Sequence, residues 1–185
     1  NLAISNKERK KIEEITSLFT LNIIVALSVV EALKTVSNLN FAIKWPNDIL
    51  AENKKIAGIL IENTFRNQNE VQSIIGIGLN VNQSQFENLP QASSLFLLEN
   101  QLFDRNALLI SIVNRLEFNL NQLENLKEDY FWNTYHAILF KKEVVSTFES
   151  ALGNRFVGKI QKVTKDGKLE VLLEDDSVTF FDVKE

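Results

Sequence analysis

Three polar side chains that could take part in chemistry lie close together in the segment KWPNDIL, residues 44–50. The proline, asparagine and aspartate at 46–48 are typical of a turn, because proline presets the angle φ and the other two bond to nearby backbone. A turn does not explain Lys44, whose ammonium group is a natural partner for phosphate. Asp48 could cap the turn or hold magnesium beside phosphates. Two interpretations stay open: a simple turn, or a turn whose Lys44, Asn47 and Asp48 face an anion.

A second candidate is the lysine pair Lys54 and Lys55, directly before an apolar segment. Two solvated lysines at a hairpin would be the common arrangement. If one of them points inward, its desolvation is costly unless a carboxylate or phosphate lies beside it. The pair therefore predicts either a solvated hairpin or an anion site.

The segment GIGLN, residues 76–80, places two glycines at the end of an apolar run. Bare backbone there lets a ligand approach closely, although glycine in a strand also marks a bulge or a tight packing contact. The segment is not the dinucleotide fingerprint, because that motif needs a third glycine opening a helix.

Composition limits the class of protein. A chain of 185 residues with 45% hydrophobic content can bury a core, and its net charge of −4 argues against a general nucleic-acid scaffold. The absence of cysteine excludes disulfides and thiolate chemistry and fits a cytoplasmic location. The single histidine, His136, lies in an aromatic segment and predicts helix packing rather than a zinc site. The absence of methionine means that Asn1 is not a translation start, so we expect a fragment.

The elements that must position these residues can be read from the hydrophobic pattern. We expect a buried helix, too polar to span a membrane, from Thr16 or Ser17 to about Val36, with Trp45 packed against it. Strands are expected at 1–5, 41–45, 55–63 and 71–82, with a loop at 64–70. Their short connections favour antiparallel pairing.

The second half of the chain changes character twice. After a polar stretch at 82–103, Asp104 is a good cap for a helix reaching Leu123, and a second helix is expected at 128–140. Beyond it, short alternating strands and the turn signal KDGK predict a small β-barrel. We therefore expect two domains, 1–141 and 142–185.

Taken together, the motifs resemble the central domain of the biotin protein ligases. KWPNDIL is followed by KKIAGILIE from residue 54 and by IIGIGLNVNQ from residue 74. The resemblance extends to ASSL at 92–95, to DRNALL from residue 104, to an aromatic segment with Trp132 and to the terminal β-rich part. It implies an α+β fold: a mixed, largely antiparallel sheet flanked by helices, similar to the catalytic core of class II aminoacyl-tRNA synthetases.

The resemblance also implies a function. Enzymes of that family use ATP and magnesium to convert biotin to biotinyl-5′-adenylate, then transfer biotin to a lysine of a carrier, commonly the biotin carboxyl carrier protein of acetyl-CoA carboxylase. Lys55 matches the lysine that contacts the biotin carboxylate and the reacting phosphate. The other matched positions surround the ligand. Lys44, Asn47 and Asp48 match the nucleotide and magnesium end of the site, and Asn80 matches an asparagine near the adenylate. Gly58, Gly76 and Gly78 match places where the backbone lies against the ligand, and Ile59 and Leu60 match neighbours of biotin.

One part of the family pattern has no match. Family members carry a glycine- and arginine-rich loop upstream of the segment NL at residues 1–2, and that loop closes over the adenylate. Without it water reaches the mixed anhydride, so we expect these 185 residues to be weakly active or inactive. Whether a DNA-binding module precedes them, as in members that repress transcription, stays open.

Two other functions compete with biotin ligation. A lipoate ligase or octanoyltransferase would share the fold class, and a non-catalytic binding module would leave the lysines solvated. An exposed sheet edge would allow a homodimer. Neither a membrane nor a nucleic acid is an expected partner.

Overall fold

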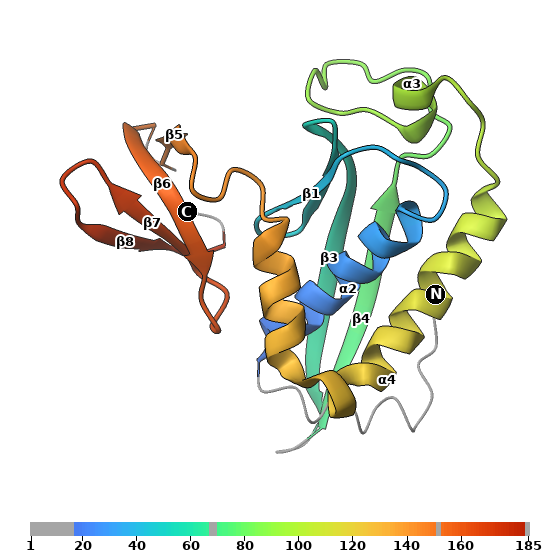
Figure 1. Ribbon diagram of the computed structural model, residues 1–185, viewed down its shortest axis with the longest axis horizontal. Coiled ribbons are helices and arrows are strands. Elements are labelled where there is room, and N and C mark those ends of the chain that lie inside the picture. The colour runs from blue at the N-terminus through green and yellow to red at the C-terminus, as the bar shows by residue number, and fades with distance from the viewer. Residues whose placement is uncertain (1–16, 67–69, 151–152, 184–185) are drawn as a thin grey trace.

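The computed structural model describes residues 17–66, 70–150 and 153–183, which form two antiparallel sheets and three helices (Figure 1). The strand predicted at 1–5 lies outside the described residues. None of the helices in these ranges is long and apolar enough to cross a membrane.

Helix α2, Leu18–Leu33, confirms the predicted buried helix. Ser17 caps it, because its side-chain oxygen accepts a hydrogen bond from Phe19 N at 3.1 Å. Buried residues lie on all sides of the helix, as expected of a helix packed between other elements. The helix ends three residues before Val36, because Lys34 begins a turn.

The first sheet has the order β1-β2-β3-β4, with every neighbouring pair antiparallel. Its strands are β1 Phe41–Lys44, β2 Asp48–Ala51, β3 Lys54–Arg66 and β4 Glu70–Leu79. The mixed sheet we expected is not found among the described strands, where parallel pairing is limited to the isolated bridges Ile43–Leu139 and Lys55–Ala92. The loop expected at 64–70 is shorter, because β3 continues to Arg66 and β4 begins at Glu70.

Strand β2 was not predicted. It is only four residues long, and Ile49 and Leu50 are buried in succession beside a register shift, so it shows no alternating pattern. The tight turn after it places Glu52 and Asn53 at positive φ, which is typical of a two-residue hairpin connection.

Helix α3, Leu95–Glu99, is a short helix inside the stretch expected to be a loop, with Ser94 as its cap. Helix α4, Arg105–Ala137, begins as predicted after Asp104, whose Oδ1 accepts hydrogen bonds from Asn106 N and Ala107 N. The two helices expected to end at Leu123 and to begin at 128 are one helical run. Figure 1 shows that this run bends sharply, so it has two arms.

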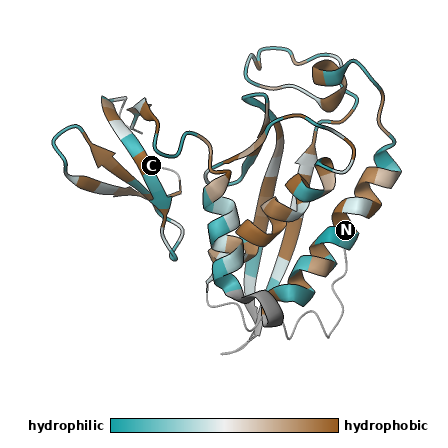
Figure 2. Ribbon diagram, in the orientation of Figure 1, coloured by the Kyte–Doolittle hydropathy of each residue, from teal (hydrophilic) through white to brown (hydrophobic). Residues whose placement is uncertain are grey.

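Helices α2 and α4 cover one face of the first sheet (Figure 1). Apolar residues of the strands and of α2 form the core between the sheet and these helices (Figure 2). On the other face, among the described residues, Leu60 and Ile74 are exposed beside Gly58, Gly76 and Gly78. This uncovered side is called the open face below.

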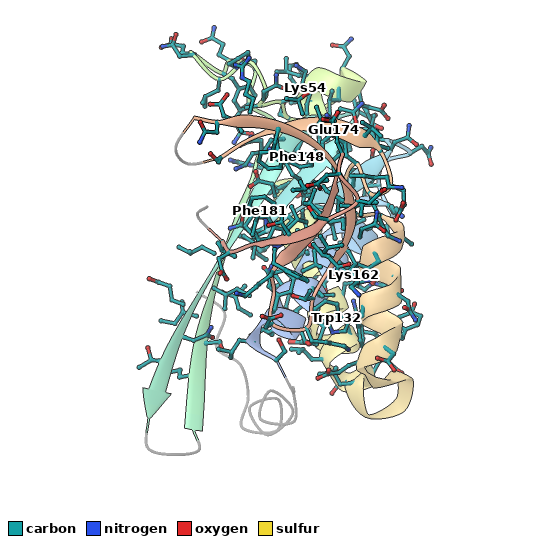
Figure 3. All side chains as sticks on the ribbon, turned by 90° about the vertical axis from the view of Figure 1, so that its left-hand side faces the viewer. Lys54, Trp132, Phe148, Lys162, Glu174 and Phe181 are labelled. Atoms are coloured by element: carbon teal, nitrogen blue, oxygen red, sulfur yellow. The ribbon has the colours of Figure 1, made fainter. Side chains whose placement is uncertain are left out.

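The second sheet has the order β5-β6-β7-β8 and is antiparallel throughout. Its strands are β5 Val145–Glu149, β6 Arg155–Val163, β7 Leu169–Leu173 and β8 Val178–Phe181. The predicted barrel is not confirmed: each strand pairs only with its neighbour in sequence, and within the described ranges no β5–β8 pairing closes the sheet. The Phe156 ring instead stacks between those of Phe148 and Phe181, with ring centroids 5.4 and 5.3 Å apart. Figure 3 shows Phe148 and Phe181 on this sheet.

The division of the chain at residue 142 stays a prediction. Hydrogen bonds on either side of it are consistent with this position. Ile43 bonds to the backbone of Ile138 and Phe140 in the first unit, and Glu143 N donates to Ile160 O in the second.

Candidate active site

The centre of the candidate site is an ion pair between strands β2 and β3. Lys55 Nζ lies 2.6 Å from Asp48 Oδ1, and the two side chains are 47% and 22% exposed. Lys55 is therefore about half exposed rather than turned inward, and Asp48 is the anion beside it. Because a pair this exposed is worth only about 1 kcal/mol or less, an incoming anion can compete for the ammonium group.

Glycines keep the space over this pair open. A Cβ atom at Gly58 would lie 3.6 Å from Asp48 Oδ1 and 3.7 Å from Lys55 Nζ. Gly78 is the register partner of Gly58 on β4, and the nearest atom to its added Cβ is Gly58 O at 3.9 Å. A ligand can therefore lie against bare backbone next to the ion pair.

A segment after β4, residues 83–92 and called the strap below, lies over the end of the sheet. Lys55 N donates to Gln91 O at 2.8 Å, and Ser93 N donates to Lys55 O at 2.9 Å. Lys54 Nζ donates to Pro90 O at 2.9 Å. The polar stretch predicted as a loop is thus fixed to the strand that carries the candidate lysine.

Asn80 ties the end of β4 to the same region. Its backbone N donates to Ile56 O at 2.8 Å, and its side-chain Nδ2 donates to Ser93 O at 3.1 Å. Ser94 Oγ donates to Gln83 O at 2.6 Å while it caps α3. These bonds hold both ends of the strap.

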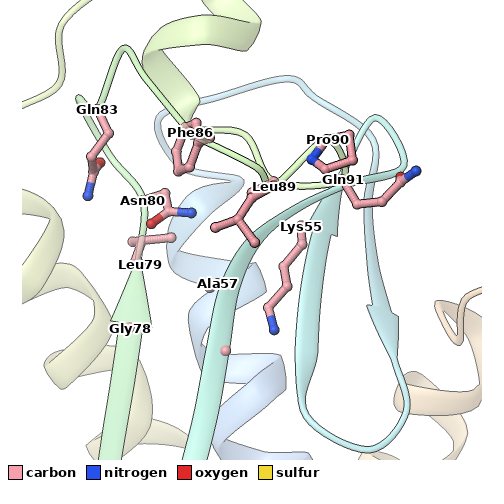
Figure 4. A pocket seen from close by; sticks show the side chains of 12 residues that line it. Lys55, Ala57, Gly78, Leu79, Asn80, Gln83, Phe86, Leu89, Pro90 and Gln91 are labelled. Carbon is pink, nitrogen blue, oxygen red and sulfur yellow. The ribbon is translucent and has the colours of Figure 1, made fainter.

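The sheet and the strap enclose a cavity of about 640 Å³, large enough for a small molecule. Figure 4 shows the Lys55 side chain extending along its wall, opposite Asn80 and below Leu89. Its lining residues are Lys55, Ala57, Gly58, Gly78, Leu79, Asn80, Gln83, Phe86, Leu89, Pro90, Gln91 and Ala92. Lys55 is the one charged residue among them, so the cavity suits a largely apolar ligand with an acidic group.

The candidates from the sequence are not all at this cavity. Lys55, Gly58, Gly78 and Asn80 line it, and Asp48 contacts Lys55. The sequence did not single out the strap residues that line it, although Phe86 and Leu89 are apolar exceptions in a polar stretch.

The remaining candidates lie around the cavity. Asn47 holds its own turn, because its Nδ2 donates to Ile59 O at 2.6 Å. Lys44 is exposed opposite Asp48. Leu60 is 61% exposed and pairs with Gly76 on the open face, whereas Ile59 is 2% exposed and its side chain packs in the core. Ile59 could therefore reach a ligand only through its backbone.

The described residues contain no group of three or more His, Cys, Asp or Glu side chains that could hold a metal ion. Asp48 alone still fits magnesium, because this ion is commonly bound by one or two carboxylates, substrate phosphates and water. It would compete with Lys55 for the same carboxylate.

His136 lies away from the cavity, on α4, with its Nε2 3.1 Å from both the N and the O of Val163 on β6. Its ring packs near Trp132 and Tyr135, as the sequence predicted. Desolvation lowers the pKa of His136, the bond to Val163 raises it, and repulsion from Lys142, Lys162 and Lys165 lowers it further. Burial raises the pKa of Tyr135.

The chain is similar to known proteins in sequence and in fold. The sequence model of the Biotin/lipoate A/B protein ligase family matches residues 2–80. The bifunctional ligase/repressor BirA of Bacillus spizizenii is 38% identical over 90 residues, which is 46% of this chain and 27% of that protein. The biotin–[acetyl-CoA-carboxylase] ligase of Mycobacterium tuberculosis is 35% identical over 102 residues, which is 55% of this chain and 36% of that protein.

A solved structure extends the likeness to the second sheet. The biotin protein ligase of Aquifex aeolicus, solved in complex with biotin and ATP, superposes with a TM-score of 0.74 at 25% identity, over 93% of this chain and 72% of that one. In fold over most of its length, and in sequence over residues 2–80, the chain is therefore similar to the biotin/lipoate protein ligases. Within that class, it is similar to biotin protein ligases in both sequence and fold. Its matches span about a quarter to a third of the length of these two curated relatives.

Proposed function

We propose that this protein is an ATP-dependent biotin–protein ligase. It would activate biotin as biotinyl-5′-AMP and transfer the biotinyl group to a lysine of a biotin carboxyl carrier protein, such as that of acetyl-CoA carboxylase. The observation that carries the proposal is the exposed Lys55–Asp48 pair beside a glycine-lined cavity. The relatives support it, since the Aquifex enzyme binds biotin and ATP.

Lys55 supplies the electrostatic part of the chemistry. In the first step a biotin carboxylate oxygen bonds to the α-phosphorus of ATP, and the bond from that phosphorus to the β-phosphate oxygen breaks to release pyrophosphate. A fixed ammonium group between carboxylate and phosphate stabilises the negative charge that gathers there. In the second step the carrier amine attacks the acyl carbon, AMP leaves, and the amine loses a proton.

The other candidates divide between the two ends of the ligand. Lys44, Asn47 and Asp48 would lie at the phosphates, with Asp48 as the protein ligand of a magnesium ion that neutralises them. Asn80 would lie near the adenylate. Gly58, Gly76 and Gly78 would offer bare backbone, and Leu60, with the backbone of Ile59, would lie near biotin.

The experiment compares Lys55→Ala with Lys54→Ala. Both lysines start β3, but Lys54 is tied to Pro90 O and does not line the cavity. With biotin, magnesium and α-labelled ATP, we expect Lys54→Ala to form biotinyl-AMP at the wild-type rate and Lys55→Ala to lose roughly 100-fold or more. Equal rates for the two variants, above a no-protein blank, would contradict the role of Lys55.

Thermal unfolding separates the competing functions. Biotin, and not lipoate, should raise the unfolding temperature, because a ligand that binds only the folded state stabilises it. Stabilisation by lipoate alone would favour the lipoate ligase. Biotin binding that is unchanged in Lys55→Ala would favour the non-catalytic module. The carrier, a homodimer and the cytoplasmic location stay predictions.

A further inference from the structure

The turn between β6 and β7, residues 164–168 and called the docking turn below, reaches from the second sheet onto the first unit. Trp45 Nε1 donates to Gly167 O at 2.8 Å, and Ser17 Oγ donates to Lys165 O at 2.5 Å. The Lys165 ammonium group lies 4.7 Å from the centroid of the Trp132 ring. The two units therefore meet next to the KWPND turn.

The docking turn has a fixed shape. Thr164 N donates to Lys168 O at 2.9 Å, and Gly167 N donates to Thr164 O at 2.8 Å. Gly167 is buried at a φ of +90°, and a Cβ atom there would lie 2.7 Å from Phe19 Cδ2. Only glycine fits this conformation and this space, so the carbonyl that meets Trp45 is held in place.

The turn that carries Trp45, residues 45–47, is anchored from three sides. Asn22 Nδ2 on α2 donates to Pro46 O at 2.7 Å. On β3, Ile59 N donates to Asn47 O at 2.9 Å and Ile59 O accepts from Asn47 Nδ2. The third anchor is the docking turn. Asp48 follows directly, so a shift of this turn moves its carboxylate relative to Lys55, which lies on β3.

We infer that Trp45 is a positioning residue through which the second sheet sets the geometry of the nucleotide end of the site. The inference rests on the proposed function for the identity of the ligand. Without its bond to Gly167, the turn keeps two anchors and stays folded, but its position is less defined. Binding at Lys44, Asn47 and Asp48 then suffers more than binding along Gly58 and Gly78, which β3 and β4 hold independently.

The first test is Trp45→Phe, which keeps an aromatic ring and removes the donor. By calorimetric titration we expect magnesium-ATP to bind about three- to tenfold more weakly, as for one lost hydrogen bond, and biotin to change less than about twofold. Equal losses for ATP and biotin, or no loss for either, would overturn the inference.

The second test needs no ligand. Gly167→Ala places a methyl group against Phe19, whereas Gly153→Ala meets the same kind of positive φ with no atom within 4 Å. In ¹⁵N spectra we expect only Gly167→Ala to shift the Trp45 indole signal and the amides of Asn47 and Asp48. Unshifted Asn47 and Asp48 signals in a folded Gly167→Ala protein would refute the inference. If Gly167→Ala does not fold, the binding measurements on Trp45→Phe decide the inference.

The two tests also separate this inference from the proposed function. A wild-type protein that binds neither ATP nor biotin contradicts the ligase, whereas the spectra still report whether the docking turn positions Asp48. If the wild-type protein forms biotinyl-AMP and Trp45→Phe binds ATP with unchanged affinity, the ligase function is supported and the inference about Trp45 is contradicted.

Discussion

At the scale of single residues, the site combines a cation, its carboxylate and bare backbone. Lys55 and Asp48 meet because the tight turn at Glu52 and Asn53 brings β2 and β3 side by side, with Asp48 opposite Gly58. The identity of residue 58 decides how much room is left over the pair. This dependence can be tested with graded substitutions.

The variants Gly58→Ala and Gly58→Val should show how strongly ligand affinity depends on the free space next to residue 58. A Cβ atom at this position makes only ordinary contacts, so the alanine variant should keep most of its affinity for biotin and ATP. The methyl groups of valine would extend over Lys55 and Asp48, and we expect about a tenfold or larger loss of affinity in titrations. Valine suits a strand, so the unfolding temperature should change little. Wild-type affinity in Gly58→Val would show that the ligand does not lie against β3.

At the scale of elements, the helix that closes the first unit also contacts the second sheet. His136 lies in the last turn of α4 with its Nε2 next to the backbone of Val163. Since burial and three nearby lysines disfavour the charged ring, the neutral form belongs to the folded state. This preference makes stability depend on pH.

Urea unfolding measured at several pH values should therefore reveal how His136 contributes to stability. Because burial lowers its pKa below the ordinary 6.5, the unfolded chain binds more protons near and below that pH. The free energy of unfolding is thus highest above pH 6.5 and falls as the pH drops through it. His136→Gln should flatten this dependence between about pH 7.5 and 5.5, where carboxylates contribute less. The chain has one histidine, so an unchanged slope would contradict the argument.

Element types were largely predictable from sequence, and element boundaries were not. The cap residues Ser17 and Asp104 mark both long helices, because short polar side chains satisfy free backbone N–H groups. Strand β2 escaped prediction because its three buried residues, Ile49 to Ala51, are consecutive, which hides the two-residue period of a strand. The predicted barrel is not confirmed, because strand spacing predicts hairpins and cannot show whether the first and last strands pair.

The candidate site was predictable only in part. Motif positions such as Lys55, Gly58 and Asn80 proved to lie together because they sit at one end of two paired strands. The strap could not be foreseen, since its place over β3 depends on backbone bonds to Lys55 that carry no side-chain signal. The core position of Ile59 follows from the alternation of β3, which puts it opposite to Leu60.

At the scale of the whole molecule, two sheets formed by different parts of the chain meet beside one site. The first sheet supplies the ion pair and the glycines, and the second contacts the turn next to them through Gly167. The biotin protein ligase of Aquifex aeolicus has a similar fold over 93% of this chain. The second unit therefore acts on the site through the Trp45 turn, because none of its described residues lines the cavity.

The central claim is that the ammonium group of Lys55 meets the carboxylate of biotin. Its most direct test is a thermodynamic cycle: titration of wild type and Lys55→Ala with biotin and with biotin methyl ester, which lacks the charge. We predict that Lys55→Ala weakens biotin by about tenfold or more and leaves the ester unchanged. Equal losses of affinity for biotin and for its methyl ester would show no coupling between the lysine and the carboxylate, and would contradict the claim.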